Sequence, residues 1–259
     1  MSMAAVGTIC WVIACFFGVL FQYECLDTMT KKGLVLKAVA ASCVVGYAIV
    51  LIMMFGESSD AAIDFVVGLV LVTIGDILVA LLELRGDATS GSLLNAASGG
   101  SNVERVILSL TGICFIVSYF FQMVAFIKGI SRHDNVTEYV APFLIFLLLP
   151  PVFTVLGGLL AKFRIPDTEL KVFIICAFYI LLASALFSAS SIFAFSLFQV
   201  DVMHATWIFF GSILFFLSLL TVEFRYARPD MHDNKPMRVT SRLLTFLGRM
   251  ILAGCAYLL

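Results

Sequence analysis

Long apolar stretches recur along most of this 259-residue chain, and they constrain its fold more than any other feature. A helix needs about 20 predominantly apolar residues to cross the hydrocarbon core of a bilayer. About eight stretches approach this length, and they cover residues 4–23, 33–55, 61–84, 106–127, 139–160, 170–196, 205–223 and 243–259. The alternation of apolar and polar residues that marks a membrane barrel is absent, so helices must satisfy the buried backbone. The sequence therefore predicts an all-α, polytopic membrane helical bundle of about eight transmembrane helices, with residues 1–259 forming a single transmembrane domain.

The composition supports this fold class and narrows the functions that fit it. Hydrophobic residues make up 62% of the chain and charged residues 13%, whereas soluble domains are about half apolar and about a quarter charged. The net charge of -1 argues against a strongly basic nucleic-acid binder. The seven cysteines show no Cys-x-x-Cys spacing, and the three histidines form no His-x-x-x-His pair. We therefore expect no metal, no cofactor and no disulfide framework.

The distribution of positive charge predicts an orientation. If the helices alternate in direction, thirteen Lys and Arg residues fall on one side of the membrane and two on the other. The larger group is Lys31, Lys32, Lys37, Arg85, Arg105, Lys162, Arg164, Lys171, Arg225, Arg228, Lys235, Arg238 and Arg242, and the smaller is Lys128 and Arg132. Because Lys and Arg are enriched in cytoplasmic loops, both termini are expected on the non-cytoplasmic side. The sequence is compatible with the endoplasmic reticulum or the plasma membrane.

Asp76 is the polar residue that fits an apolar helix least well, because it lies within the run from Val66 to Leu82. An ionisable group at membrane depth costs several kcal/mol and is by default a functional-site hypothesis. Asp76 precedes the cytoplasmic end of its predicted helix by eight residues, which corresponds to a depth of roughly 12 Å. The alternative is a protonated carboxyl group that serves only helix packing.

Other charged residues share the cytoplasmic half of the predicted helices with Asp76. They are Lys37, Glu83, Glu223 and Arg249, and together with Asp76 they come from four helices. This distribution predicts a polar cluster in one leaflet. The first three also fit ordinary boundary charges whose side chains extend toward the membrane surface. For Arg249 the alternative is a last helix that begins later than residue 243.

An internal repeat is a further hypothesis. Gly68 is followed seven residues later by Gly75 and Asp76, and Gly211 is followed seven residues later by Ser218 and Leu219. The two predicted helices are four apart and run in the same direction. This spacing favours a four-plus-four duplication, although glycine is common in membrane helices for packing reasons alone.

Several motifs carry a resemblance to a known family over most of the chain. The segment from Gly68 to Asp76 is similar to a Gly-Leu-x-x-Ser-x-x-Gly-Asp helix, with Val72 at the serine position. The segment from Phe115 to Phe126 resembles Phe-x-x-x-His-x-x-Tyr-x-x-x-Phe, with Tyr119 and Gln122 at the His and Tyr positions. These motifs resemble the YhhN family, whose characterised members include the lysoplasmalogenases.

Three further segments extend the resemblance and show where the chain departs from it. Lys37 resembles the lysine of the family's Lys-Pro pattern, with the proline lost, and Gly254 stands where glutamine is expected. The segment from Gly211 to Ser218 is similar to Gly-Ala-x-x-Phe-x-x-Ser. In the family that motif continues into an aspartate, and here the position is Leu219. The second intramembrane carboxylate of the family is therefore missing.

The resemblance implies hydrolysis of the vinyl ether bond of a lysoplasmalogen, a lysophospholipid, to a fatty aldehyde and glycerophosphoethanolamine or glycerophosphocholine. Asp76 is then one catalytic carboxyl group. Glu223, one helical turn after Leu219 on the same face, is expected to replace the lost aspartate. Lys37 and Arg249 are expected to bind the lipid phosphate. Four more residues are candidates to line the substrate pocket, and helix packing is the alternative for them: Ser118, Tyr119, Gln122 and Ser218.

Two other functions remain open from the sequence. The missing aspartate at Leu219 and the missing histidine at Tyr119 favour a catalytically impaired protein that binds or transports a lipid. A lone intramembrane Asp near a Lys is also what a proton relay needs, which fits a proton-coupled carrier.

Overall fold

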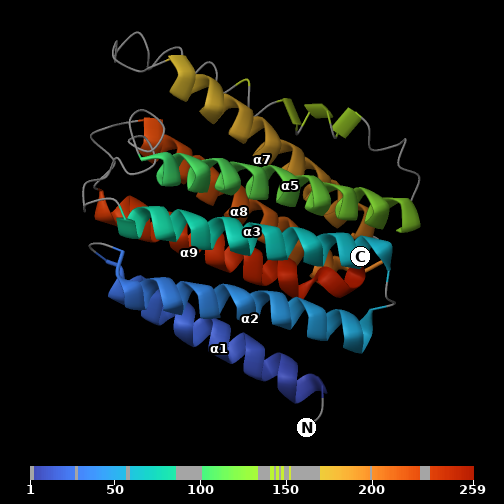
Figure 1. The fold of residues 1–259 in the computed structure, drawn as a ribbon. Helices are drawn as coiled ribbons and strands as arrows, with labels where there is room; N and C mark the ends of the chain where they lie inside the picture. Colours follow the sequence, from blue (N-terminus) through green and yellow to red (C-terminus); the bar gives the residue numbers. More distant parts are fainter. Residues whose placement is uncertain are drawn as a thin grey trace. The chain divides into compact units, whose positions relative to one another are not determined.

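The computed structural model describes most of the chain and is helical wherever it forms regular elements (Figure 1). The described residues are 3–26, 29–56, 59–85, 101–133, 141–142, 144–145, 147–148, 152, 170–198, 200–227 and 234–259. Within them lie seven long helices and one short 3-10 helix. These are α1 (Met3–Glu24), α2 (Lys31–Phe55), α3 (Asp60–Arg85), α5 (Asn102–His133), α7 (Leu170–Leu197), α8 (Val202–Ala227), α9 (Lys235–Gly254) and η3 (Ala256–Leu258).

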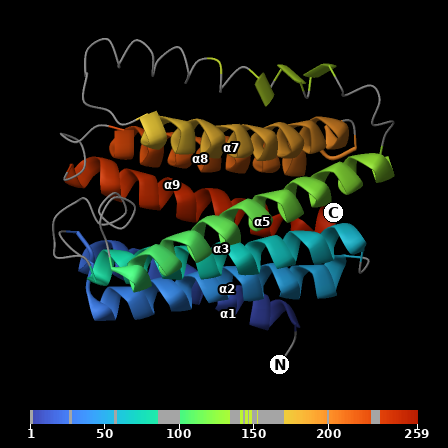
Figure 2. The same cartoon turned by 45° about the horizontal axis from the view of Figure 1, so that its top comes forward.

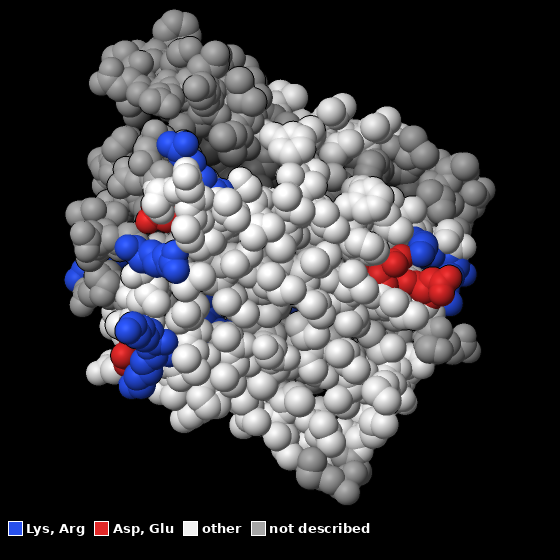
Figure 3. Space-filling view, viewed as in Figure 1, with Lys and Arg blue, Asp and Glu red and all other residues white. Residues whose placement is uncertain are grey.

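All seven long helices of the described residues are long and apolar enough to cross a membrane. The all-helical fold is thus confirmed, and the seven apolar helices are compatible with an integral membrane protein. The eighth predicted span, over 139–160, lies mostly outside the described residues, and the internal repeat stays a prediction. Figure 3 shows uncharged side chains over most of one face, with the charged ones near the ends of the helices.

Two helices begin four or more residues earlier than their apolar stretches do. α5 begins at Asn102, where Ser101 and Glu104 form reciprocal hydrogen bonds: the Ser101 N–H donates to Glu104 Oε2 over 2.8 Å, and the Glu104 N–H donates to Ser101 Oγ over 3.3 Å. α9 begins at Lys235, where the N–H of Met237 donates to Asn234 Oδ1 over 3.1 Å. The prediction that the last helix begins at residue 243 or later is therefore wrong. Its first two turns are polar, and capping rather than hydropathy marks where it begins.

The chain divides into two compact units, Met1–Ala125 with Ala253–Leu259, and Phe126–Leu252. In the first unit, α1 packs on α2, and α2 packs on α3, as both Figures 1 and 2 show. η3 contacts α2 and α3, and its Tyr257 ring lies 5.7 Å from the ring of Phe55. The single transmembrane domain expected over 1–259 stays a prediction.

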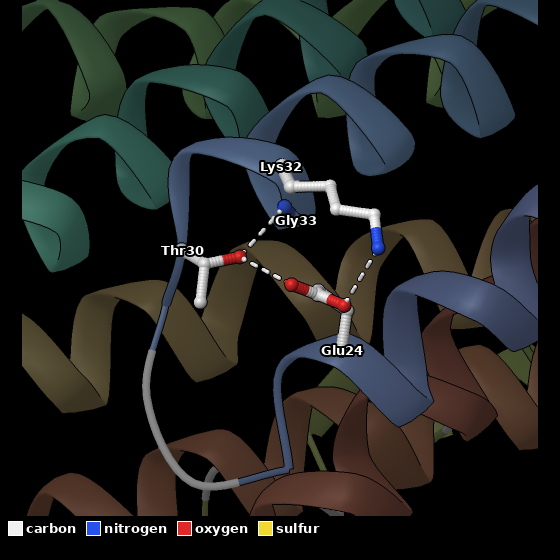
Figure 4. A network of polar contacts seen from close by, with 4 residues as sticks. All are labelled: Glu24, Thr30, Lys32 and Gly33. Carbon is white, nitrogen blue, oxygen red and sulfur yellow. Dashed lines mark hydrogen bonds and ion pairs between the residues drawn. The ribbon is translucent and has the colours of Figure 1, made fainter.

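A polar network joins α1 to the start of α2 (Figure 4). The hydroxyl of Thr30 accepts a 2.9 Å bond from the N–H of Gly33 and lies 3.4 Å from Glu24 Oε1. Lys32 Nζ donates to Glu24 Oε2 over 3.2 Å. Thr30 thus caps α2, while Glu24 links the end of one helix to the start of the next. Because Lys37 lies on the second turn of α2, this network also sets the position of a predicted site residue.

In the second unit, α7 packs on α8, and their Phe187 and Phe216 rings stack at 4.9 Å. The helices α8 and α9 approach closely at two glycines. A Cβ added at Gly248 would lie 2.7 Å from the backbone nitrogen of Phe215, and one at Gly211 would lie 2.8 Å from Cγ2 of Ile251. Small residues let membrane helices approach in this way. The two contacts also set the antiparallel register, since residues 211 and 215 face 251 and 248.

Candidate functional site

The structure brings Lys37 and Asp76 together in the first unit. Lys37 Nζ donates a hydrogen bond to the backbone carbonyl oxygen of Asp76 over 3.0 Å. Lys37 follows the first residue of α2 by six residues, and Asp76 precedes the last residue of α3 by nine. A rise of 1.5 Å per residue gives depths of roughly 9 and 14 Å along the two antiparallel helices. The long lysine side chain covers the difference between these levels.

An aromatic ring completes the surroundings of the ammonium group. Lys37 Nζ lies 5.9 Å from the ring centroid of Phe21, near the end of α1. Phe21 is buried and clusters with Cys25 and Leu36. A cation in this position gains a hydrogen bond and a cation–π contact in place of part of its hydration shell. Phe21 is a site residue that the sequence did not predict, because the apolar residues of α1 give no sign of which face meets α2.

Of three predicted pocket residues on α5, Ser118 and Gln122 lie where α5 meets α3 at Gly68, and Tyr119 contacts another residue of α5. Ser118 Oγ donates to the carbonyl oxygen of Gly68 over 2.8 Å, and Gln122 Nε2 donates to Ser118 Oγ over 3.0 Å. Tyr119 is buried, and its ring stacks on that of Phe115 at 6.2 Å. Gly68 precedes Asp76 by eight residues, or roughly 12 Å along the helix. These contacts favour helix packing for Ser118, Tyr119 and Gln122, and a role in the pocket stays a prediction.

The remaining predicted site residues belong to the second unit. Ser218 is buried, and its hydroxyl donates to the carbonyl of Phe215 in its own helix over 2.6 Å. Leu219, which follows the segment that resembles the family motif, is 5% exposed. The guanidinium carbon of Arg249 lies 5.6 Å from the centroid of the Phe215 ring. Glu223 belongs to α8, and its side chain lies outside the described residues. The convergence of Asp76 with Glu223 and Arg249 stays a prediction.

Asp201 and His204 meet at the start of α8, and this contact was not predicted from the sequence. Asp201 Oδ1 accepts a 3.1 Å bond from the N–H of His204, and the imidazole Nδ1 of His204 contacts Asp201 Oδ2. Hydrogen bonds from the backbone and ring of His204 lower the pKa of Asp201. The Asp-x-x-His spacing before an apolar run is the signal for this cap. In the described part of the chain, no three His, Cys, Asp or Glu side chains come together as a metal site requires.

The Lys37 ammonium group lies against the Phe21 ring and the backbone carbonyl of Asp76, a residue whose side chain carries a carboxyl group. Such a set can hold an anionic headgroup, transfer a proton or do both. Comparisons with protein-family models, curated proteins and solved structures found no match to the chain. The geometry around Lys37 and the motif resemblance are therefore the grounds for inferring a function.

Proposed function

We propose that the protein is a multi-pass membrane hydrolase, similar to the YhhN lysoplasmalogenases, that cleaves the vinyl ether bond of a lysoplasmalogen. One observation carries the proposal. Lys37 and Asp76 both lie in segments that resemble family motifs, and Lys37 Nζ donates a 3.0 Å hydrogen bond from α2 to the backbone carbonyl oxygen of Asp76 in α3. The substrate is a lysophospholipid, and the bilayer delivers it to the cytoplasmic leaflet where we place this pair.

The chemistry that we assign to Asp76 is proton delivery. Its carboxyl group donates a proton to the double-bond carbon that is not bonded to oxygen. This step leaves an oxocarbenium ion at the carbon that bears the ether oxygen. Water adds to that carbon, and the resulting hemiacetal releases the fatty aldehyde and the glycerol hydroxyl of the headgroup. Glu223 takes the proton from the attacking water. Lys37 and Arg249 bind the lipid phosphate and orient the substrate.

Aldehyde release from a synthetic lysoplasmalogen tests this function in vesicles that contain the full chain. Asp76→Asn should lower the rate about 100-fold or more, because general acid catalysis contributes about 10²- to 10⁴-fold. Glu223→Gln should lower it by a similar factor. The matched control is Asp64→Asn, which removes an acidic residue from the other end of α3. Absence of aldehyde with the wild-type chain would refute hydrolysis, and an equally active Asp76→Asn variant would exclude Asp76 from the reaction.

A lipid-binding or lipid-transport protein is the second candidate. The observation that favours it is Leu219, a buried leucine at the position of the family's second aspartate. Lipid that copurifies with the chain and is not turned over would support this function. A proton-coupled carrier is the third candidate, because Lys37 and Asp76 also suit a proton relay. Flux driven by a pH gradient in vesicles would support the carrier.

We also propose that the chain is an integral protein of the endoplasmic reticulum or the plasma membrane, with both termini non-cytoplasmic. Its support is the excess of Lys and Arg on one side of the predicted spans. Reporter fusions at each terminus test this topology. A cytoplasmic signal from either end would refute it.

A further inference from the structure

The helix α9 carries its charged residues along one side. Lys235, Arg238, Arg242, Thr245 and Arg249 are spaced by three, four, three and four residues. At 100° per residue these five positions fall within an arc of about 80°. They extend over 15 residues, whose 14 steps correspond to about 21 Å of helix. We call these five residues the α9 stripe, and this periodicity is independent of the Lys37 and Asp76 pair.

The α9 stripe does not share the side of the helix that is most exposed. Leu243 and Leu247 are 38% and 47% exposed, and their positions lie about 140° from the centre of the stripe. Arg238, Arg242 and Arg249 are each only partly exposed. Cations that only extend toward the membrane surface would cluster at one end of the helix. Here they descend along it, on the side away from its exposed leucines.

The charged residues of α9 are all cationic, and Asp230 and Asp233 precede the helix in the sequence. Residues 235–259 contain four Lys and Arg residues and no Asp or Glu. The neighbouring helix α8 has no Asp, Glu, Lys or Arg between residues 202 and 222. The register set by Gly211 and Gly248 places Glu223 at about the level of Arg238, which is the outer part of the stripe. The deeper part of the stripe therefore lies beside uncharged residues of α8.

We infer that the α9 stripe binds the phosphate of a membrane lipid headgroup and admits it from the Lys235 end. Arg238 and Arg242 are one helical turn apart, so both guanidinium groups can contact one phosphate. Guanidinium groups bind phosphate through paired, charge-assisted hydrogen bonds. Arg249 is about two turns deeper and lies over the Phe215 ring. This inference rests on the proposed function for the class of lipid, since a lysophospholipid carries such a phosphate.

Binding to the purified full-length protein in neutral detergent tests the inference with three probes. They are lysophosphatidic acid, a monoacylglycerol of the same chain length that lacks the phosphate, and inorganic phosphate. We expect lysophosphatidic acid to bind at least about tenfold more tightly than either of the others. Arg238→Gln and Arg242→Gln should each weaken its binding about tenfold, the effect of one charge-assisted hydrogen bond. Arg105→Gln, which removes an exposed cation from the first turn of α5, should leave the affinity unchanged.

Several results would overturn the inference. Equal affinity for monoacylglycerol would show that the phosphate is not recognised, and equal affinity for inorganic phosphate would indicate a site for a soluble anion. Affinities of the stripe variants equal to that of Arg105→Gln would exclude the stripe. Arg242→Lys separates recognition from misfolding: it keeps the charge but loses the paired hydrogen bonds, so it should bind lysophosphatidic acid more weakly than the wild type and more tightly than Arg242→Gln. Lysophosphatidic acid has no vinyl ether, so its binding holds or fails independently of aldehyde release.

Discussion

The close approach of α5 to α3 at Gly68 gives a prediction whose size follows from the structure. A Cβ added at Gly68 would lie 2.6 Å from Cγ of Gln122 and 3.0 Å from the carbonyl oxygen of Ser118. The first distance is too short for two carbon atoms, so Gly68→Ala must displace the Gln122 side chain or separate the helices. Either movement disturbs the 3.0 Å bond from Gln122 to Ser118. The variant should therefore be destabilised even though it adds a single methyl group.

The magnitude combines three contributions. Overpacking costs about 1–3 kcal/mol. Weakening a buried hydrogen bond adds about 0.5–1.5 kcal/mol. Alanine recovers about 0.5–1 kcal/mol through its higher helix propensity. The expected net loss in the free energy of unfolding is about 0.5–4 kcal/mol. Gly112, on α5, is the matched control because an added Cβ there meets nothing within 4 Å, so Gly112→Ala should be neutral or slightly stabilising.

Unfolding of the purified protein in mixed micelles of a mild detergent and dodecyl sulfate measures both variants. We also expect the substitutions at residues 68 and 122 to be coupled, because Gln122→Ala removes the Cγ atom that the new methyl group meets. The double variant should therefore be more stable than the sum of the two single losses predicts. A Gly68→Ala protein as stable as Gly112→Ala would refute the packing argument. If the losses in the free energy of unfolding for Gly68→Ala and Gln122→Ala simply add, the Gln122 side chain is not what the new methyl group meets.

Three further predictions concern other parts of the chain. Thr30→Ala should lower the free energy of unfolding by about 1 kcal/mol in denaturation experiments, because it removes the side-chain cap of α2, whereas Thr30→Ser should retain it. The contacts from His204 lower the pKa of Asp201 in the folded protein. Their stabilising effect is therefore present above pH ~4, and it is lost as the pH falls through the folded-state pKa of Asp201. Thermal unfolding should therefore show Asp201→Asn to be less stable than the wild type at pH 7, with the difference shrinking in acid; a constant difference would contradict the linkage. Deletion of residues 256–259 should lower the melting temperature, because buried Ala256 and Leu259 leave with η3, which packs on α2 and α3; an unchanged melting temperature would contradict this.

The apolar stretches were sufficient to predict the helices, because membrane spans of about 20 apolar residues leave the backbone few other conformations. The same signal failed for the first two turns of α9, which are polar and begin at the Asn234 cap. Depth counting predicted that Lys37 and Asp76 share one leaflet, since antiparallel neighbours bring the start of one helix beside the end of the next. It did not predict which helix faces which. Phe21 and the bond from Ser118 to Gly68 therefore required the three-dimensional structure.

The hydrogen bonds that position α3 make it possible to test the Asp76 carboxyl group separately from the position of the helix. Lys37 from α2 donates to the backbone carbonyl of Asp76, and Ser118 from α5 donates to that of Gly68, eight residues away. Both bonds use main-chain oxygens of α3, which no side-chain substitution at residue 76 removes. Asp76→Asn therefore changes the charge and the proton of the carboxyl group while it preserves the Lys37 bond that joins α2 to α3. A loss of aldehyde release in that variant, with unchanged thermal stability, would assign the loss to the carboxyl group rather than to the position of α3.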